Sequence, residues 1–145
     1  MQSLADILTK DSILLDYNAN SLEQALQAIA TLASEMSGLR PQTIIEKLSE
    51  RIAQGVGVGG GVAIPHARFE GLHRTIGFYV RLRVPLQLAG QPVDTMFIML
   101  APEYADAEHL KALAHVARLL RTPESRDRLN RADSKESVFD LLAAA

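Results

Sequence analysis

Apolar residues recur with the period of an amphipathic helix in two segments of the first third of the chain. The first segment opens at Ser21, which forms a capping box with Gln24 three residues later, and it stops at Gly38. Its apolar positions are Leu22, Ala25, Leu26, Ile29, Leu32, Ala33 and Met36. The second segment begins at Pro41, which suits a first helical turn, and ends before Gly55. The pattern predicts two consecutive helices.

Short apolar runs bounded by turn residues and prolines indicate strands. Residues 13–15 form a brief apolar run, and residues 75–82 are rich in β-branched and aromatic side chains. Pro85 is expected to interrupt this second strand, because proline has no backbone N–H to donate. Residues 93–100 are mostly apolar and lie between two prolines, which is the pattern of a central strand covered on both faces.

Three further helices are expected toward the C-terminal end. Asp106 is a candidate N-cap for a helix that carries His109 and an apolar stripe. Thr122 and the proline after it open a short helix, and Ser134 caps a last one. Helices that alternate with strands in a chain of this length predict an α/β fold in a single compact domain, residues 1–145.

Composition narrows the classes of partner. The 145 residues are 48% hydrophobic and carry a formal net charge of −2, which argues against a protein that binds nucleic acid through a basic surface. No segment has 18 consecutive apolar residues, and the N-terminus lacks a basic segment followed by an apolar one. Cysteine is absent, which excludes disulfides and thiol chemistry. A cytoplasmic protein that does not insert into membranes is expected.

The most unusual stretch is residues 55–68, GVGVGGGVAIPHAR. It places five of the nine glycines in seven positions, followed by a short apolar run and then by Pro65 and His66. Glycine tolerates positive φ and proline ends a strand, so the order indicates a flexible loop, a buried strand and a presented histidine. A mobile loop beside an incidental surface histidine is the alternative.

Two nucleotide-binding motifs fit this stretch poorly. A P-loop needs lysine and a hydroxyl residue after its last glycine, where Val62 and Ala63 stand. Gly55, Gly57 and Gly60 have the spacing of G-x-G-x-x-G. That motif follows a strand and opens a helix, whereas this one precedes an apolar run that ends at proline. Nucleotide binding is therefore not expected here.

The four histidines do not predict a metal site. His109 and His115 are six residues apart, so on a helix their side chains point about 120° from each other. His73 has no second ligand near it in the sequence, and cysteine is absent. Neither a metal nor another cofactor is expected.

The glycine-rich stretch resembles a known signature. Residues 57–66, GVGGGVAIPH, are similar to Thr-Gly-Ile-Gly-Asn-Gly-Val-Ala-Ile-Pro-His in the fructose/mannitol/nitrogen-regulatory enzyme IIA domains of the bacterial phosphotransferase system. Gly60 stands where that signature has asparagine. The resemblance covers nearly the whole chain, because similar segments are found at residues 4–8, 33–51, 101–103 and 109–114. It is strongest to the nitrogen-regulatory branch, and it implies a small mixed β-sheet flanked by helices on both faces.

The resemblance assigns roles to two histidines. His66 matches the histidine that is phosphorylated in the family. His109 matches a histidine that faces it, and a neutral imidazole there can donate a hydrogen bond to the phosphoryl group. The amides of Gly59, Gly60 and Gly61 are expected to bind phosphate oxygens as an anion nest.

Two arginines are candidates to offset the charge of the phosphoryl group. Arg68 lies two residues beyond His66, so in an extended segment its side chain leaves on the same side. The family has an arginine sixteen residues before its histidine, whereas Arg51 lies fifteen residues before His66. One residue turns a helical side chain by about 100°, so Arg51 is expected to point away unless the shortened loop compensates. Arg68 is therefore expected to contribute more than Arg51.

The resemblance implies a phosphoryl carrier. It would accept phosphate on His66 from a histidine-containing phosphocarrier protein and act, as a nitrogen-related regulatory enzyme IIA, on target proteins that the sequence does not identify. Two alternatives stay open. One is a separate enzyme IIA arm of a fructose/mannitol-type sugar permease, and the other is a protein-interaction module of the same fold in which His66 is not phosphorylated.

Overall fold

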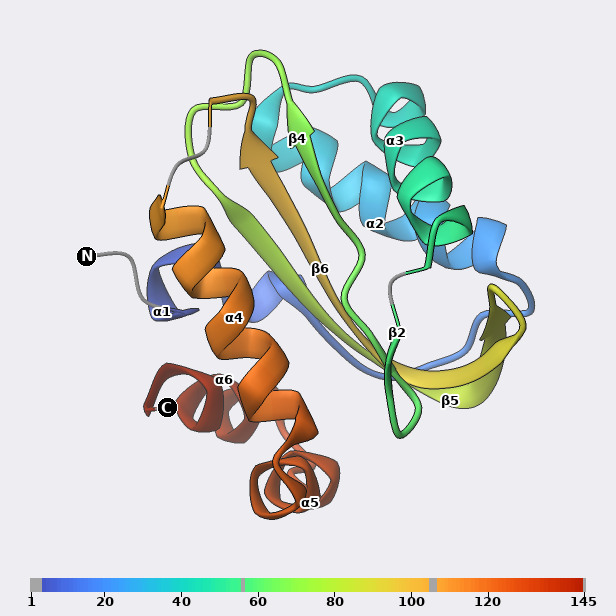
Figure 1. The fold of residues 1–145 in the computed structure, drawn as a ribbon, viewed down its shortest axis with the longest axis vertical. Coiled ribbons are helices and arrows are strands. Elements are labelled where there is room, and N and C mark those ends of the chain that lie inside the picture. The colour runs from blue at the N-terminus through green and yellow to red at the C-terminus, as the bar shows by residue number, and fades with distance from the viewer. Residues whose placement is uncertain (1–3, 56, 105–106, 145) are drawn as a thin grey trace.

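The computed structural model describes residues 4–55, 57–104 and 107–144. A β-sheet forms its centre, and helices cover both faces (Figure 1). The helices are α1 (Leu4–Ile7), α2 (Leu22–Ser37), α3 (Pro41–Ala53), α4 (Ala107–Arg121), α5 (Pro123–Arg131) and α6 (Lys135–Ala144). The strands are β1 (Ile13–Tyr17), β2 (Gly57–Gly59), β3 (Val62–Ala63), β4 (His66–Phe69), β5 (Ile76–Leu88) and β6 (Gln91–Pro102).

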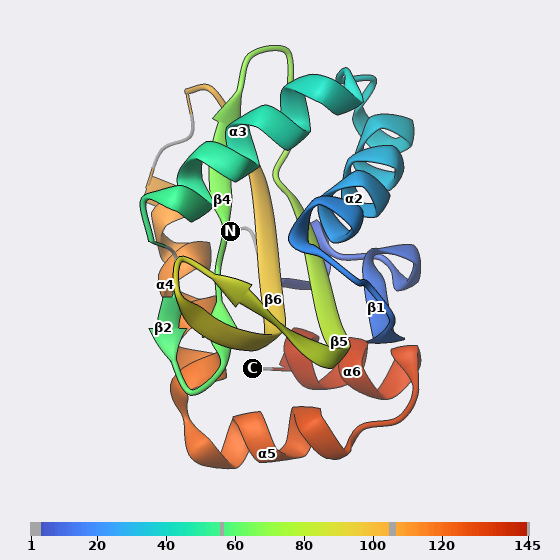
Figure 2. The same ribbon diagram turned by 90° about the vertical axis from the view of Figure 1, so that its right-hand side faces the viewer.

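The sheet combines parallel and antiparallel pairs. Its strands run in the order β1-β5-β6-β3-β2, and β4 also pairs with β6. β5 is antiparallel to β6 and β2 to β3, whereas β1 is parallel to β5, and β3 and β4 are parallel to β6. α2 and α3 pack on one face, and α1, α4 and α6 on the other (Figure 2). This arrangement confirms the expected α/β fold, a single compact domain with a small mixed sheet between helices.

β6 is the central strand, as its apolar run predicted. It pairs with β5 along one side and with β3 and β4 in succession along the other. Residues 96–101 have no exposed surface. Val62 lies opposite Thr95, and His66 lies opposite Met99. His66 is thus attached directly to the most buried strand of the sheet.

The strand that carries Pro85 is longer than expected. β5 continues through Pro85 to Leu88, so the expectation that the proline interrupts the strand is wrong. Its pairing with β6 is displaced between Arg81 and Leu86. The proline therefore falls where the ladder does not need its missing N–H.

The glycine-rich stretch forms a hairpin from β2 and β3. Gly59, Gly60 and Gly61 have φ values of 88°, 64° and 82°, which residues with a Cβ atom rarely adopt. The carbonyl oxygen of Gly61 accepts the N–H of Asp94 at 2.9 Å and the N–H of Thr95 at 3.2 Å. One carbonyl oxygen of the hairpin therefore binds two consecutive amides of β6, directly before Val62 pairs with Thr95.

The helix starts agree with the caps expected from the sequence where they can be compared. The Ser21 hydroxyl accepts the N–H of Gln24 at 3.1 Å at the start of α2. The Ser134 hydroxyl accepts the N–H of Ser137 at 3.1 Å at the start of α6. The expected cap at Asp106 lies outside the described residues.

Candidate functional site

His66 opens β4, and among the described residues this strand pairs only with β6. Successive side chains of a strand point to opposite faces. Ala67 and Phe69 are buried in the core beneath α2 and α3. His66 and Arg68 therefore lie together on the opposite face, which is the relation that the sequence predicted for this pair.

The imidazole of His66 is held in one orientation by two contacts. Its Nδ1 lies 2.7 Å from the carbonyl oxygen of Ile64, and its Nε2 lies 3.2 Å from Nη2 of Arg51. A carbonyl oxygen only accepts hydrogen bonds, so in the neutral ring Nδ1 carries the hydrogen and Nε2 keeps the lone pair. A guanidinium only donates, which agrees with this tautomer. Nε2 is therefore the ring nitrogen that carries the lone pair.

Two cations from α3 bind the outer edge of β4. The Pro65 carbonyl accepts the N–H of a β6 residue. Carbonyls alternate in direction along a strand, so those of His66 and Arg68 point away from β6. Nε of Arg51 donates to the carbonyl of residue 66 at 3.1 Å. Nζ of Lys47 donates to the carbonyl of residue 68 at 2.9 Å. The two cations are four residues apart on a helix, which is about 6 Å, and the two carbonyls are two residues apart on a strand, which is about 6.6 Å. Each cation therefore lies close to one carbonyl.

Arg51 therefore contacts His66 and does not point away, despite its one-residue displacement in the sequence. It lies in the last turn of α3, which ends at Ala53. α3 crosses the outer edge of β4 (Figure 2), and its last turn brings Arg51 into contact with His66. The packing of helix against strand compensates for the one-residue shift in sequence spacing.

A cleft of about 540 Å³ opens on this face between α3, β4 and α4. His109, in the first turn of α4, lines it, is only 4% exposed, and has an Nδ1 without a hydrogen-bond partner among the described residues. Burial, and then the neighbouring charges of Arg68 and His66, lower the pKa of His109. Its imidazole is thus neutral at neutral pH. The cleft brings together four residues selected from the sequence, namely His66, His109, Arg51 and Arg68.

The cleft also contains residues that the sequence argument did not select. They are Lys47, Glu50 and Gln54 from α3, and Leu110 and Leu113 from α4. Lys47 lies one helical turn before Arg51, so the i, i+4 spacing was an available signal. The leucines belong to an apolar helical pattern, which more often marks a core. No sequence signal distinguished them.

Gly59, Gly60 and Gly61 do not line this cleft, so the structure does not bring together with His66 the amides that were expected to bind phosphate. They line a separate cleft of about 560 Å³ between the β2–β3 hairpin and the β5–β6 turn. The described residues that line this second cleft include no charged side chain. β3 and β4 pair with β6 four residues apart, which places His66 about 13 Å along the sheet from Val62. The intervening strand carries the histidine away from the glycine turn.

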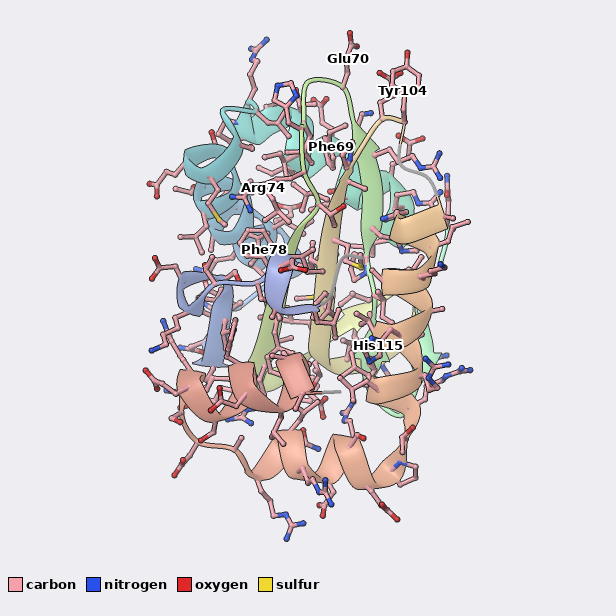
Figure 3. All side chains as sticks on the ribbon, turned by 90° about the vertical axis from the view of Figure 1, so that its left-hand side faces the viewer. Phe69, Glu70, Arg74, Phe78, Tyr104 and His115 are labelled. Carbon is pink, nitrogen blue, oxygen red and sulfur yellow. The ribbon has the colours of Figure 1, made fainter. Side chains whose placement is uncertain are left out.

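The described part of the chain contains no cluster of three His, Asp or Glu side chains that could hold a metal ion. His115 lies farther along α4 than His109 (Figure 3), is half-buried and does not line the His66 cleft.

None of the described helices combines the length and the apolar character needed to cross a membrane.

The chain is similar to known proteins over almost its full length. Residues 6–145 match the model of a family described as "Phosphoenolpyruvate-dependent sugar phosphotransferase system, EIIA 2". The chain is 39% identical to a nitrogen regulatory protein of Bradyrhizobium diazoefficiens, with 97% of this chain and 94% of the relative covered. A nitrogen regulatory protein of Pseudomonas aeruginosa is 37% identical, with 98% and 96% covered. The crystal structure of IIA-Ntr from Neisseria meningitidis, 33% identical, superposes with a TM-score of 0.90 over 96% of this chain and 98% of that one.

Proposed function

The chain belongs to the EIIA 2 family of the phosphoenolpyruvate-dependent sugar phosphotransferase system, and we propose that it is a phosphoryl carrier of the nitrogen-regulatory branch. His66 accepts a phosphoryl group from a histidine-containing phosphocarrier protein in the cytoplasm. The phosphorylated and unphosphorylated forms then act differently on regulated proteins. The relatives named nitrogen regulatory proteins support the choice of branch.

The observation that carries this proposal is the orientation of the His66 ring. Nδ1 is fixed on the carbonyl of Ile64 at 2.7 Å, so Nε2 keeps its lone pair, and the ring lines the cleft. A histidine that attacks phosphorus needs a neutral imidazole with one unprotonated and oriented nitrogen. An incidental surface histidine needs no such restraint. The restraint therefore weighs against an interaction module in which His66 is never phosphorylated.

The transfer step needs little chemistry from the protein. The Nε2 lone pair attacks phosphorus opposite the N–P bond of the donor, the new N–P bond forms, and the electron pair of the old bond leaves with the donor imidazole. The hydrogen on Nδ1 of His66 stays in place. The Ile64 carbonyl, which accepts that hydrogen, stabilises the positive charge on the ring directly after transfer.

Three neighbours are placed to stabilise the transferred group. Arg51 donates to Nε2 before transfer, and its Nη2 turns to a phosphoryl oxygen when phosphorus occupies that position. Arg68 lies on the same face as His66 and lines the same cleft. His109 is neutral because its pKa is lowered, so it can donate one hydrogen bond without adding charge.

Intact-mass measurement tests the proposal. The protein is incubated with phosphoenolpyruvate and the general phosphotransferase proteins, and the wild-type chain is expected to gain one phosphoryl group. His66→Ala is expected to gain none while melting as a folded protein. His115→Ala is the matched control, because His115 lies outside the cleft, and it is expected to behave as the wild type. A phosphoryl group on His66→Ala would overturn the assignment.

A small phosphoryl donor separates the chemistry from protein docking. Phosphoramidate transfers a phosphoryl group to neutral imidazoles without a protein partner. Modification of His66 by phosphoramidate alone would retain the nucleophile and reject the protein donor. The sugar-permease alternative predicts in addition that the phosphorylated chain passes its group to a sugar-specific enzyme IIB domain, and release of phosphate to such a domain would favour it.

A further inference from the structure

The His66 cleft concentrates positive charge in a protein whose formal net charge is −2. Among the described residues its lining contains three cations, Lys47, Arg51 and Arg68, and one carboxylate, Glu50, which together carry a net charge of +2 while both histidines are uncharged. Charge of one sign in a concave site attracts ligands of the opposite sign. The cleft of the unphosphorylated protein is thus suited to an anionic group.

None of the three cations has a carboxylate partner among the described residues. Lys47 and Arg51 bind backbone carbonyls instead, which holds their charges in place without neutralising them. Arg126 on α5 is different, because it pairs with Asp94 at 2.8 Å. Cations that are already positioned and still unneutralised reduce the ordering cost of binding an anion.

One side of the cleft has an apolar rim. Leu110 from α4 is 57% exposed, and Leu113 is half-buried in the same lining. A free small anion gains nothing from an exposed leucine, whereas an apolar contact beside a charged one is typical of a protein interface. The combination fits a carboxylate side chain that is followed by an aliphatic residue.

The edge of β4 excludes docking by strand addition. A peptide that adds a strand needs free backbone groups on the edge. The outward carbonyls of His66 and Arg68 already accept from Arg51 and Lys47. A partner has therefore to enter this cleft with a side chain.

We propose that the unphosphorylated cleft binds an acidic side chain of a regulated protein, with an adjoining aliphatic residue on Leu110, and that a phosphoryl group on His66 excludes this partner. The inference rests on the proposed function. The phosphoryl oxygens carry up to about two negative charges, and they use the same donors of Arg51 and Arg68 as the carboxylate. The switch is a direct competition for one site and needs no change of fold.

A blocked peptide of alternating glutamate and leucine tests this proposal, and the peptide with glutamine in place of glutamate is its control. Binding to the unphosphorylated chain at low salt is followed by NMR through the imidazoles of His66 and His109 and the methyl groups of Leu110. The glutamate peptide is expected to shift these signals and to bind about tenfold more tightly than its control. Equal binding of both peptides, or no shift in the cleft, overturns the proposal.

Substitutions of cleft cations identify where the peptide binds. Lys47→Gln and Arg68→Gln are each expected to weaken binding of the glutamate peptide by about threefold to tenfold. Arg74→Gln is the matched control, because Arg74 is exposed but does not line the cleft (Figure 3). Equal losses in the three variants would indicate unspecific attraction and would overturn the proposal.

The phosphorylated chain tests the competition. With a phosphoryl group on His66, introduced by the protein system or by phosphoramidate, the affinity for the glutamate peptide is expected to fall by about tenfold or more. An affinity for the glutamate peptide that is unchanged by phosphorylation would contradict the proposed competition. Failure of both donors to modify His66 contradicts the proposed function instead, and the peptide measurements on the unmodified chain distinguish that outcome.

Discussion

The glycine hairpin and the start of β4 belong to one stretch of sequence but have different roles. Gly61 and His66 are five residues apart, yet they line different clefts. Among the described residues, the hairpin cleft is lined by no charged side chain, whereas the His66 cleft is lined by three cations and a carboxylate. The glycines determine the path of the backbone. The reactive surface is assembled by side chains from α3 and α4, which are distant in the sequence.

This difference has a measurable consequence. Changes in the hairpin should alter stability more than phosphoryl transfer, and changes in the cleft should alter transfer more than stability. The transfer rate from the phosphocarrier protein and the free energy of unfolding in urea measure these two effects.

The largest effect is expected for Arg51→Ala. This variant loses two hydrogen bonds that Arg51 donates, one to Nε2 of His66 and one to the backbone carbonyl of His66. We expect transfer to slow by about 10²-fold, the usual loss for a preorganised charge-stabilising donor. Rapid-quench measurement of phosphorylated protein gives the rate, and Arg74→Ala is the control. A rate close to the wild type would show that the observed contacts do not act on the transferred group.

Arg68→Ala is expected to slow transfer by about tenfold, through loss of one charge-assisted contact. Arg68 lines the cleft but has no observed bond to the His66 ring. This order, Arg51 before Arg68, reverses the order expected from sequence spacing. The same rapid-quench assay decides it, and a larger loss for Arg68→Ala would restore the original order.

Gly61→Ala tests the hairpin. Gly61 has a φ of 82°, and an added Cβ would lie 3.3 Å from Oδ1 of Asp94. We expect the free energy of unfolding to fall by about 1–2 kcal/mol, the cost of a left-handed conformation for a residue with a Cβ atom. The transfer rate of the folded variant is expected to change little. A loss of transfer without a loss of stability would make the hairpin part of the site.

The lowered pKa of His109 predicts a loss of stability on acidification. Its pKa in the folded state lies below the ordinary 6.5, so as the pH falls below that value the unfolded state takes up the proton first. The free energy of unfolding therefore decreases until the folded pKa is reached. Urea unfolding at about pH 7.5 and about pH 5.5 should show a smaller decrease in His109→Gln. An equal decrease in wild type and variant would contradict the assignment, and His115→Gln is the histidine control.

The smallest effect is expected for Gly60→Asn, which introduces the asparagine of the family signature. Gly60 has a φ of 64°, and an added Cβ would meet nothing within 4 Å. Asparagine tolerates this left-handed conformation better than other residues with a Cβ atom. We expect a change in stability within about 0.5 kcal/mol and an unchanged transfer rate. A faster rate in the asparagine variant would connect the hairpin to the chemistry and remove the contrast between the two regions.

The sequence predicted those features that local patterns decide. The Ser21 cap, the central position of β6 and the presentation of His66 beside Arg68 follow from capping, apolar runs and strand alternation. The α/β class follows from the same patterns. These features need only a few consecutive residues to be specified.

Features that depend on packing between elements were not predictable in this way. Arg51 reaches His66 because α3 crosses the edge of β4, and residue spacing carries no information on that crossing. The glycines were assigned to the phosphate site because they are close to His66 in sequence. Four residues of β6 separate the partners of Val62 and His66, which places His66 about 13 Å along the sheet from the residue that follows the glycines. Distance along the chain was a poor guide to distance in the fold.

The carbonyl oxygen of Gly61, which accepts two amides of β6, affects the register in which β3 and β4 pair with β6. A strand that slips by one residue exchanges its two faces. In the strand after the hairpin, such a slip along β6 would turn Ala67 and Phe69 to the solvent and bury His66 and Arg68. The carbonyl oxygen of Gly61, which accepts the amides of both Asp94 and Thr95, helps to fix the position of the hairpin on β6. Two hydrogen bonds far from the cleft thereby help decide which face of β4 presents the histidine.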